Sequence, residues 1–311
     1  MSPSRIHEAG VAVALAAVLC GDVHAATKSA PDVAVVSSLS GSVTVVAPPS
    51  SRPQVLSAFD WLTARSLVTV NAGSRLTLAF VDGRRCEIEG AATVVVTATG
   101  PRLRSGTLRS LPPVPPFPRF PVLAREGAPG VRSGAVRIRV GLDTPIRGVY
   151  PRAGARSVAA ATVLQFDPVA GMTDSYHVEI EDESGATVFE ADTRSPSLPV
   201  PDAALRAGAR YFWRVQATDR VGATSSGAGE VVTLHADDVR RRSALHRALE
   251  ERPEPELRLL LAEIDWRLGL WREARDGFQA ALATSPDPVA VQARLSRIEE
   301  RLGDERGPQG R

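Results

Sequence analysis

The sequence predicts a multidomain chain with an all-β domain, a second β domain of the sandwich type and an α-helical repeat segment. Three observations carry this prediction. Short β-branched runs separated by turn residues fill residues 32–104, and a similar pattern returns over residues 135–235. From Asp237 onward the hydrophobic residues take a helical period. The length of 311 residues allows two or three domains.

Residues 1–25 are typical of a secretory signal peptide. An unbroken run of apolar or small side chains covers residues 9–21, which is shorter than the roughly 20 residues that span a bilayer. A small-x-small tripeptide ending at Ala25 marks a cleavage site. We therefore expect a periplasmic or secreted chain with no stable transmembrane anchor. Lipidation of Cys20 and a retained N-terminal anchor remain as alternatives.

Charge and cysteine content exclude several classes of protein. The net charge of +2 is too small to indicate a nucleic-acid partner. Cleavage of the leader would leave Cys86 as the one cysteine, so no internal disulfide is expected. Cys86 and Ile88 alternate with charged residues, and this period of two predicts that Cys86 faces a core rather than acting as a reactive thiol.

The first domain, residues 26–110, is predicted to consist of strands alone. Its β-branched runs are punctuated by glycines, and no stretch of helical period interrupts them. Asp82 and Gly83 stand between two of the runs, and both tolerate the positive φ of a tight hairpin turn. Trp61 follows this domain's Phe59 and Asp60 and either marks a binding surface or fills a core, as large aromatics usually do.

This domain resembles the FecR domain of bacterial envelope proteins. The matching features are an initial G-x-V strand at Gly41, a ramp of alternating residues into Ala72-Gly73-Ser74, and an L-x-F-x-D-G turn over residues 78–83. The resemblance implies an exported, non-enzymatic domain that is often part of signalling across the envelope. Signalling members also carry a cytoplasmic segment that regulates sigma factors, followed by a membrane span. The sequence shows neither before the domain, so we expect no direct role in transcription control.

Residues 111–130 are predicted to be a linker. Six prolines fall within the eleven residues 111–121, which favours extended polyproline II geometry and a semi-rigid spacer. The next domain, residues 131–236, shows period-two alternation in two runs, around Val178 and around Trp213. The spacing of its turns is typical of a β-sandwich.

This second domain resembles fibronectin type III and related immunoglobulin-like domains. The stretch 205–217 matches the family's corner-and-strand signature, with Tyr211 at the tyrosine corner. Phe166 occupies the position where the family usually places tryptophan. The resemblance implies an adhesion-like module and says nothing of what it binds.

Residues 237–304 are predicted to be helical, and residues 305–311 a disordered tail. Three apolar stripes recur at helical spacing within 257–268, 271–282 and 291–302. Pro255 and Pro288 suit the first turns of helices, where a missing backbone N–H costs nothing. Residues 246–255 also align with residues 278–288 at an offset of 33.

A period near 34 with helix–turn–helix character resembles the tetratricopeptide repeat. Residues 255–288 carry the signature positions Leu261, Ala262, Gly269, Trp271, Ala274, Phe278, Ala281 and Pro286. One full repeat with two partial ones is fewer than the roughly three that such solenoids need. We therefore expect the segment to pack on the sandwich or on another copy of the chain.

The tetratricopeptide resemblance also implies a partner-binding surface, because the first helix of each repeat in that family lines a concave groove. Position-by-position transfer assigns this groove to Glu256, Leu259, Glu263, Trp266, Arg267, Arg297 and Arg301. Trp266 has an alternative role as a cap on the hydrophobic core, since tryptophan is usually well buried.

No pattern in the sequence predicts catalysis or a cofactor. Beyond the leader the histidines are His177, His235 and His246, at spacings unlike any metal-ligand set. Hydrolase elbows, phosphate-binding loops and dinucleotide fingerprints are absent from the sequence. The acidic run 179–183 suits either calcium or a solvated strand edge, and the shared outward face of its glutamates favours the edge.

The function predicted from the sequence is that of an exported, non-catalytic interaction or scaffold protein of the bacterial envelope. Its partners would be envelope proteins, and self-association is possible. One alternative is a FecR-like signalling component that acts through a separate membrane regulator. Another is a hydrolase with an unrecognised site.

Overall fold

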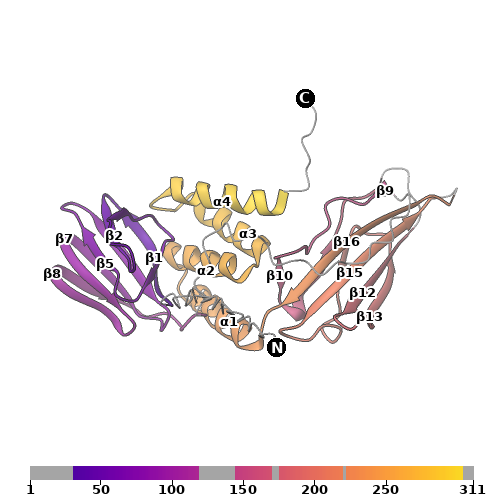
Figure 1. Cartoon of the computed structure of the whole chain (residues 1–311), viewed down its shortest axis with the longest axis horizontal. Helices are drawn as coiled ribbons and strands as arrows, with labels where there is room; N and C mark the ends of the chain where they lie inside the picture. The colour runs from indigo at the N-terminus through magenta and orange to yellow at the C-terminus, as the bar shows by residue number, and fades with distance from the viewer. Residues whose placement is uncertain (1–30, 119–143, 170–174, 220–221, 304–311) are drawn as a thin grey trace, which may run out of the picture.

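The structure, a computed structural model, describes residues 31–118, 144–169, 175–219 and 222–303. The predicted signal peptide, the second part of the predicted linker and the predicted tail lie outside the described residues. Two β domains stand at opposite ends of the molecule, and the C-terminal helices lie between them (Figure 1). Among the described helices, none combines the length and the apolar character needed to cross a bilayer.

The N-terminal domain is a single antiparallel sheet that curves around its core, as the sequence predicts for an all-β domain. Its path runs β3-β2-β5-β7-β6-β1-β4, and β8 pairs with the long strand β7. The strands are β1 (Asp32–Ser40), β2 (Val43–Val46), β3 (Gln54–Val55), β4 (Trp61–Thr63), β5 (Leu67–Val70), β6 (Arg75–Phe80), β7 (Arg85–Thr97) and β8 (Gly100–Leu111).

The predicted hairpin at Asp82-Gly83 is confirmed, with β6 and β7 paired across it and Gly83 at a φ of 89°. Cys86 and Ile88 face the core, again as predicted. Burial raises the pKa of the Cys86 thiol to about 12, so it stays protonated and unreactive at neutral pH. On the other face of β7, however, Arg85 and Glu87 are also buried. Alternation distinguishes the two faces of a strand and does not reveal that both are covered.

The second domain is a β-sandwich with an immunoglobulin-like arrangement. One sheet has the order β10-β16-β15-β12-β13, with β9 also on β16, and β11 pairs with β14 opposite it. The strands are β9 (Thr144–Pro145), β10 (Arg156–Ser157), β11 (Val163–Gln165), β12 (Tyr176–Asp182), β13 (Thr187–Thr193), β14 (Ser197–Pro199), β15 (Arg210–Thr218) and β16 (Thr224–Thr233), with a short 3₁₀ turn at Ala159–Ala161.

Two side chains in the sandwich core occupy the roles that the sequence predicts. The Arg206 backbone N–H donates to the Tyr211 hydroxyl at 2.7 Å, which is the hydrogen bond of a tyrosine corner. Phe166 packs edge-on against Tyr176, with ring centroids 4.7 Å apart. Both contacts stabilise the corner and the strand packing, and neither indicates a ligand.

The C-terminal segment forms four helices, α1 (Ala236–Glu251), α2 (Pro255–Leu268), α3 (Trp271–Leu282) and α4 (Pro288–Gly303). Pro255 and Pro288 begin their helices as predicted. The three apolar stripes correspond to α2, α3 and α4, while α1 buries only Leu245 and Ala248 and gives a weaker pattern. This explains why the stripes alone predict three helices and the structure has four.

The first residues of the predicted linker are packed rather than acting as a spacer. Val114 donates its backbone N–H to Gly83 at 2.8 Å, and Phe117 donates to Val81 at 3.2 Å. A Cβ on Gly83 would lie 2.0 Å from the Val114 carbonyl oxygen, so this turn requires glycine. Phe117 is 0% exposed, in a cluster shared by the N-terminal domain and the helices. Proline content therefore predicts the extended backbone but not the packing of the apolar side chains between the prolines.

Candidate functional site at the domain junction

Helix α2 is the element around which the junction is built. Pro255 begins it, and Gly269 ends it in the left-handed region at a φ of 82°, with its N–H bonded to the Trp266 carbonyl at 3.0 Å. Apolar side chains lie all around this helix rather than on one stripe, a pattern typical of a buried helix. Helix α2 accordingly has neighbours on several sides, including α1, α3 and β1.

A buried carboxylate, Glu263, joins the helices to the N-terminal domain. Its Oε1 accepts from the Trp61 indole Nε1 at 3.0 Å, and its Oε2 lies 3.1 Å from the Arg294 Nε of α4. The Arg294 guanidinium also donates to the Phe59 carbonyl at 3.4 Å. Burial raises the pKa of Glu263, and the Arg294 charge opposes that rise. One carboxylate thus links α2, α4 and β4.

A second ion pair lies one turn further along α2. Arg267 forms an ion pair with Asp32 of β1, and both side chains are largely buried. The Arg267 guanidinium also stacks over the Trp61 ring, with its Cζ 4.7 Å from the ring centroid. Burial raises the pKa of Asp32, while Arg267 acts to lower it. Trp61 therefore packs within the chain at this junction, the second of the two roles considered for it.

The seven residues assigned to a partner groove are placed mostly inside the chain. Leu259 and Glu263 are each about 1% exposed, and Glu256 and Arg267 form ion pairs with the N-terminal domain. Arg297 is exposed on α4, and Arg301 lies over the Trp271 ring at 5.9 Å. For Glu256, Glu263 and Arg267 the expectation of an open groove is corrected, because the N-terminal β domain contacts the side chains that were assigned to a separate protein.

The structure places Trp266 in its alternative role, as a cap on the hydrophobic core. It packs against the cluster formed by α2, α3 and α4, with its ring centroid 6.4 Å from that of Trp271. It is partly buried and belongs to the cover of the hydrophobic core. The structure therefore brings Glu256, Leu259, Glu263 and Arg267 to the junction, and places Trp266 and Arg301 together around Trp271.

Several junction residues are missing from the prediction: Asp32, Arg85, Glu254 and Arg294. Each is a charged residue in a segment whose pattern suggests a solvated face, and each pairs with a residue far away in the sequence. One feature of the sequence does indicate the junction. The apolar residues of the run LRLLLAEI, residues 257–264, extend beyond one face of a helix, which is typical of a helix buried on several sides.

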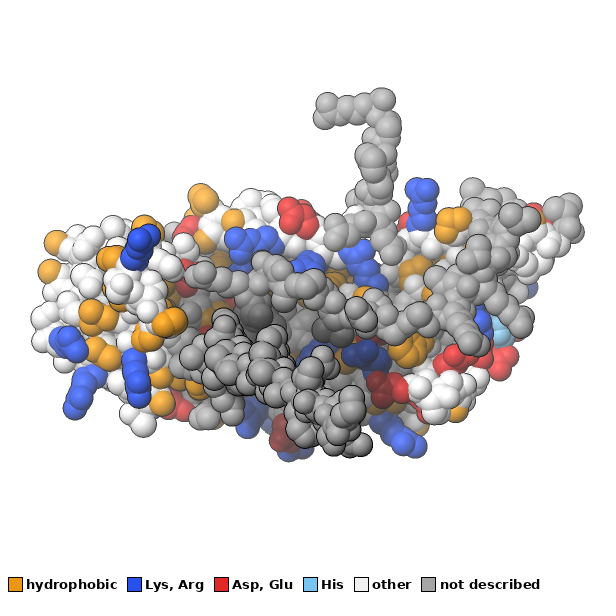
Figure 2. Space-filling model, viewed as in Figure 1, with side chains coloured by type: hydrophobic (Ala, Val, Ile, Leu, Met, Phe, Trp, Pro, Cys, Tyr) orange, Lys and Arg blue, Asp and Glu red, His pale blue; other side chains and the backbone are white. Residues whose placement is uncertain are grey.

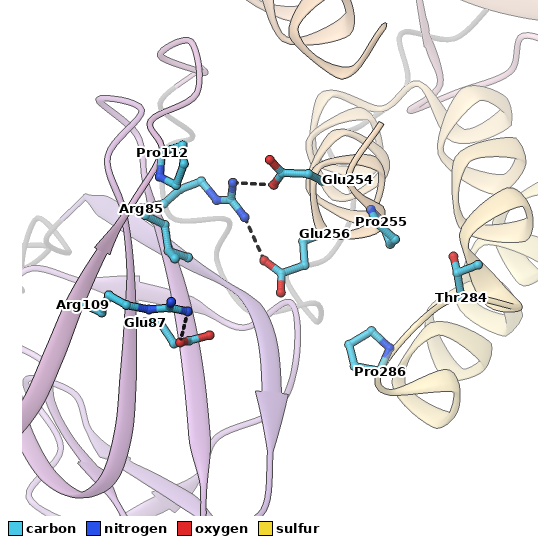
Figure 3. Close-up of a pocket in the computed structure, with 10 residues that line it drawn as sticks. Arg85, Glu87, Arg109, Pro112, Glu254, Pro255, Glu256, Thr284 and Pro286 are labelled. Carbon is cyan, nitrogen blue, oxygen red and sulfur yellow. Dashed lines mark hydrogen bonds and ion pairs between the residues drawn. The ribbon is translucent and has the colours of Figure 1, made fainter. Parts of the chain in front are cut away.

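A charged cleft of about 430 Å³ opens at the edge of this junction (Figure 3). The Arg85 guanidinium bridges two glutamates of the α1–α2 corner, with Nη1 2.9 Å from Glu254 and Nη2 2.8 Å from Glu256. Below it, Arg109 of β8 reaches Glu87 at 2.6 Å. The Arg85 Nε is buried without an acceptor among the described residues. The remaining walls of the cleft are Leu111, Pro112, Pro255, Thr284 and Pro286.

Most polar side chains of this cleft are paired with one another. Its carboxylates are engaged by arginines, and the Thr284 hydroxyl donates to the Ala281 carbonyl at 3.3 Å. A hydrolytic site needs a nucleophile or activated water beside a free base. Within the described residues, no group of three or more metal-ligating side chains comes together either. The buried Arg85 guanidinium links the N-terminal domain to the start of α2 through its two half-exposed glutamate partners.

A different contact joins the helices to the sandwich. Arg272 of α3 stacks over the Tyr150 ring at 3.8 Å and donates to the Gln165 side chain. The Arg156 backbone N–H donates to the Gly269 carbonyl at 2.8 Å, where α2 ends. Burial raises the pKa of Tyr150 to about 12. No buried ion pair is recorded on this side among the described residues.

Comparison with known proteins finds no matching family and no similar curated protein. Solved structures with partial similarity include CopC from Methylosinus trichosporium OB3b, at 18% identity and a TM-score of 0.23, covering 28% of this chain and 90% of that one. A two-domain fibronectin type III segment of chicken tenascin has 11% identity and a TM-score of 0.24, covering 65% and 85%. A β-1,2-glucanase from Parabacteroides distasonis has 12% identity and a TM-score of 0.25, covering 82% and 39%. Similarities this low carry no argument about activity.

Proposed function

We propose that this chain is an exported, non-catalytic scaffold protein of the bacterial envelope, in which the C-terminal helices hold two β domains apart. In this proposal the N-terminal domain is FecR-like, the sandwich is of the fibronectin type III kind, and the helices are tetratricopeptide-like. The outward surfaces of the two β domains then present binding sites at a set separation.

The observation that most supports a scaffold role is that α2 forms ion pairs with the N-terminal domain. Its charged side chains pair with Asp32 and Arg85 of the N-terminal domain instead of facing solvent. Removing two charges from water costs several kcal/mol per ion unless the pairing geometry is good. A chain that buries charges at a domain junction gains a specific arrangement of domains, which is what a scaffold requires.

Export is tested in cells. The full chain, tagged at its C-terminus, is fractionated and its N-terminal residue is determined. We expect envelope-associated protein that begins near Ala26. Recovery of the uncleaved chain from the cytoplasm would contradict the export part of the proposal.

Partner binding is tested with a photo-reactive amino acid. Amine cross-linkers are unsuitable because Lys28 is the one lysine in the chain. The photo-reactive residue replaces Val55 or Val289, each 77% exposed, and replaces the buried Phe278 as the matched internal control. We expect adducts of discrete mass with an envelope protein from an exposed position and none from Phe278. Equal absence of adducts at all three positions would contradict the interaction role.

A further inference from the structure

Two strands of the molecule keep an open edge at opposite ends. Strand β8 pairs with β7 on one side and has no strand on its other side among the described residues. Strand β13 likewise pairs with β12 and ends the larger sheet of the sandwich. Figure 1 shows β8 at the far left of the molecule and β13 in the right-hand domain. Open edges present unpaired backbone N–H and C=O groups that accept another strand.

The open edge of β8 is basic. The strand carries Arg102, Arg104 and Arg109 and has no acidic residue between Gly100 and Leu111. Arg102 lies opposite Val95, and Arg109 lies opposite Glu87. The neighbours of these partners in β7 face the core, so Arg102 and Arg109 are on the outer face of the sheet. The Arg109 side chain stays 67% exposed although it contacts Glu87.

The open edge of β13 is acidic. Glu190 and Asp192 alternate with Phe189 and Ala191, and their side chains are 62% and 72% exposed. They share the outer face of the sheet with Glu179 and Glu181 of β12. The basic groups of β12 and β15 on this face are His177, Arg210 and Arg214, and each of them contacts acidic side chains. Figure 2 shows acidic side chains gathered near a histidine on the right-hand domain and basic ones projecting from the left-hand domain.

The charges select which edges can join. Opposite charges facing each other across two strands stabilise the pair, and like charges destabilise it. Pairing of β8 with a second β8 would place arginines against arginines, and pairing of β13 with a second β13 would place acids against acids. Pairing of β8 with β13 brings the complementary sets together on one outer face. Because one chain carries both edges at opposite ends, the complementary partner is a second copy of the chain.

We propose that the protein self-assembles head to tail, with the β8 edge of one copy pairing with the β13 edge of the next to form a continuous sheet. The contact is heterologous, so it generates an open filament or a ring rather than a closed two-fold dimer. The seven residues of β13 limit the length of the added ladder. This inference goes beyond the proposed scaffold role and is tested on purified protein, so it stands or fails apart from export.

The test uses two charge-reversal variants of the full chain and sedimentation over a concentration series. The basic-edge variant is Arg102→Glu with Arg104→Glu, and the acidic-edge variant is Glu190→Arg with Asp192→Arg. At low ionic strength the unmodified chain should gain mass with concentration, and each variant alone should stay at the mass of a single chain. An equimolar mixture of the two variants should regain assembly. The reversed β8 edge of one variant is complementary to the reversed β13 edge of the other, and their two unchanged edges are complementary as before, so the variants can alternate along the assembly.

Matched controls change as many exposed charges elsewhere. Arg241→Glu with Arg247→Glu on α1, and Glu299→Arg with Glu300→Arg on α4, should assemble as the unmodified chain does. Salt of about 1 M, where the screening length falls to about 3 Å, should weaken assembly. Hydrogen exchange should slow at the amides of β8 and β13 in the assembled sample only. A monomer at every concentration, assembly of the edge variants equal to that of the unmodified chain, or no rescue on mixing would each overturn the proposal.

Discussion

On the side that faces the N-terminal domain, the helices form a largely buried ion pair between Arg267 and Asp32 and a half-exposed one between Glu254 and Arg85. The buried Glu263–Arg294 pair of α2 and α4 also contacts this domain, through Trp61 and the Phe59 carbonyl. On the side that faces the sandwich, they contribute Arg272, which stacks on Tyr150 and donates to Gln165, and a backbone hydrogen bond at Gly269. The rest of this contact is apolar packing of Tyr150 and Ala155 against the helices.

The sandwich directly precedes the helices in sequence, whereas the N-terminal domain lies more than a hundred residues away. The domain next to the helices in sequence is therefore not the one that contacts them through the more specific interactions. We expect the junction of the helices with β1, β4 and β7 to carry most of the coupling between domains.

The largest effect is expected at Glu263. Glu263→Ala leaves the Trp61 indole N–H without its acceptor and the largely buried Arg294 guanidinium without its counter-charge, which should lower the free energy of unfolding by about 3–5 kcal/mol. Urea denaturation followed by tryptophan fluorescence measures this. Glu299→Ala, on the exposed face of α4, is the matched control and should change stability by less than about 0.5 kcal/mol. Equal effects of the two substitutions would mean that the junction carries no special coupling.

A similar loss is expected in the packed part of the linker. Phe117 is fully buried, with its ring 6.1 Å from that of Trp61. Phe117→Ala should cost about 3–4 kcal/mol, toward the low end for buried phenylalanine because the linker backbone can move to fill the space. The exposed Pro116 supplies the control, as Pro116→Ala. If Phe117→Ala lowered the free energy of unfolding by less than about 1 kcal/mol, residues 112–118 would be a spacer rather than a packed segment.

The third prediction concerns pH and the contact of α1 with α2. Arg242 holds Asp265 through its Nε at 2.6 Å and its Nη2 at 2.9 Å. Burial raises the pKa of Asp265 from 3.8 to about 6. Between these values the folded state binds more protons than the unfolded state, so the contribution of Asp265 to stability falls as the pH rises.

Asp265→Asn removes this titration while keeping the shape of the side chain. The stability of the unmodified chain minus that of Asp265→Asn should therefore decrease between pH 4 and pH 7, by up to about 3 kcal/mol. Urea titrations at unit steps of pH give the difference, in which other buried carboxyl groups cancel. A flat or rising difference would show that the pKa of Asp265 is not raised in the folded chain.

The smallest effect is expected on the sandwich side. Arg272→Ala removes one cation–π contact with Tyr150 and one hydrogen bond to Gln165, with a loss of about 1 kcal/mol. Thermal unfolding of this variant and of the exposed control Arg247→Ala measures the difference. A loss at Arg272 as large as that at Glu263 would erase the distinction between the two junctions.

Local patterns in the sequence predicted local structure well. The Asp82-Gly83 turn, the inward Cys86, the hydrogen bond of Tyr211 and the proline starts of α2 and α4 all depend on neighbours within a few residues. The signal peptide and the tail remain predictions, because both lie outside the described residues.

Long-range contacts were not predictable from the same patterns. Arg85 and Glu87 alternate with core residues as solvated residues would. Arg85 is covered by Glu254 and Glu256 at the start of α2, and Glu87 is covered in part by Arg109 of β8. Glu263 was expected in an open groove because the tetratricopeptide resemblance places its position there, and it is buried instead. Its partners Trp61 and Arg294 come from β4 and α4, and periodicity within α2 holds no information about either.

We predict that non-covalent contacts with the helices are enough to keep the N-terminal domain in place when the covalent connection is cut. A specific protease site placed between residues 126 and 140 of the full chain tests it directly. After cleavage at physiological salt, the N-terminal piece should co-elute with the rest of the chain in size-exclusion chromatography, and the same cleavage in Glu263→Ala should release more of it. Separation of the two pieces in the unmodified chain would contradict the account.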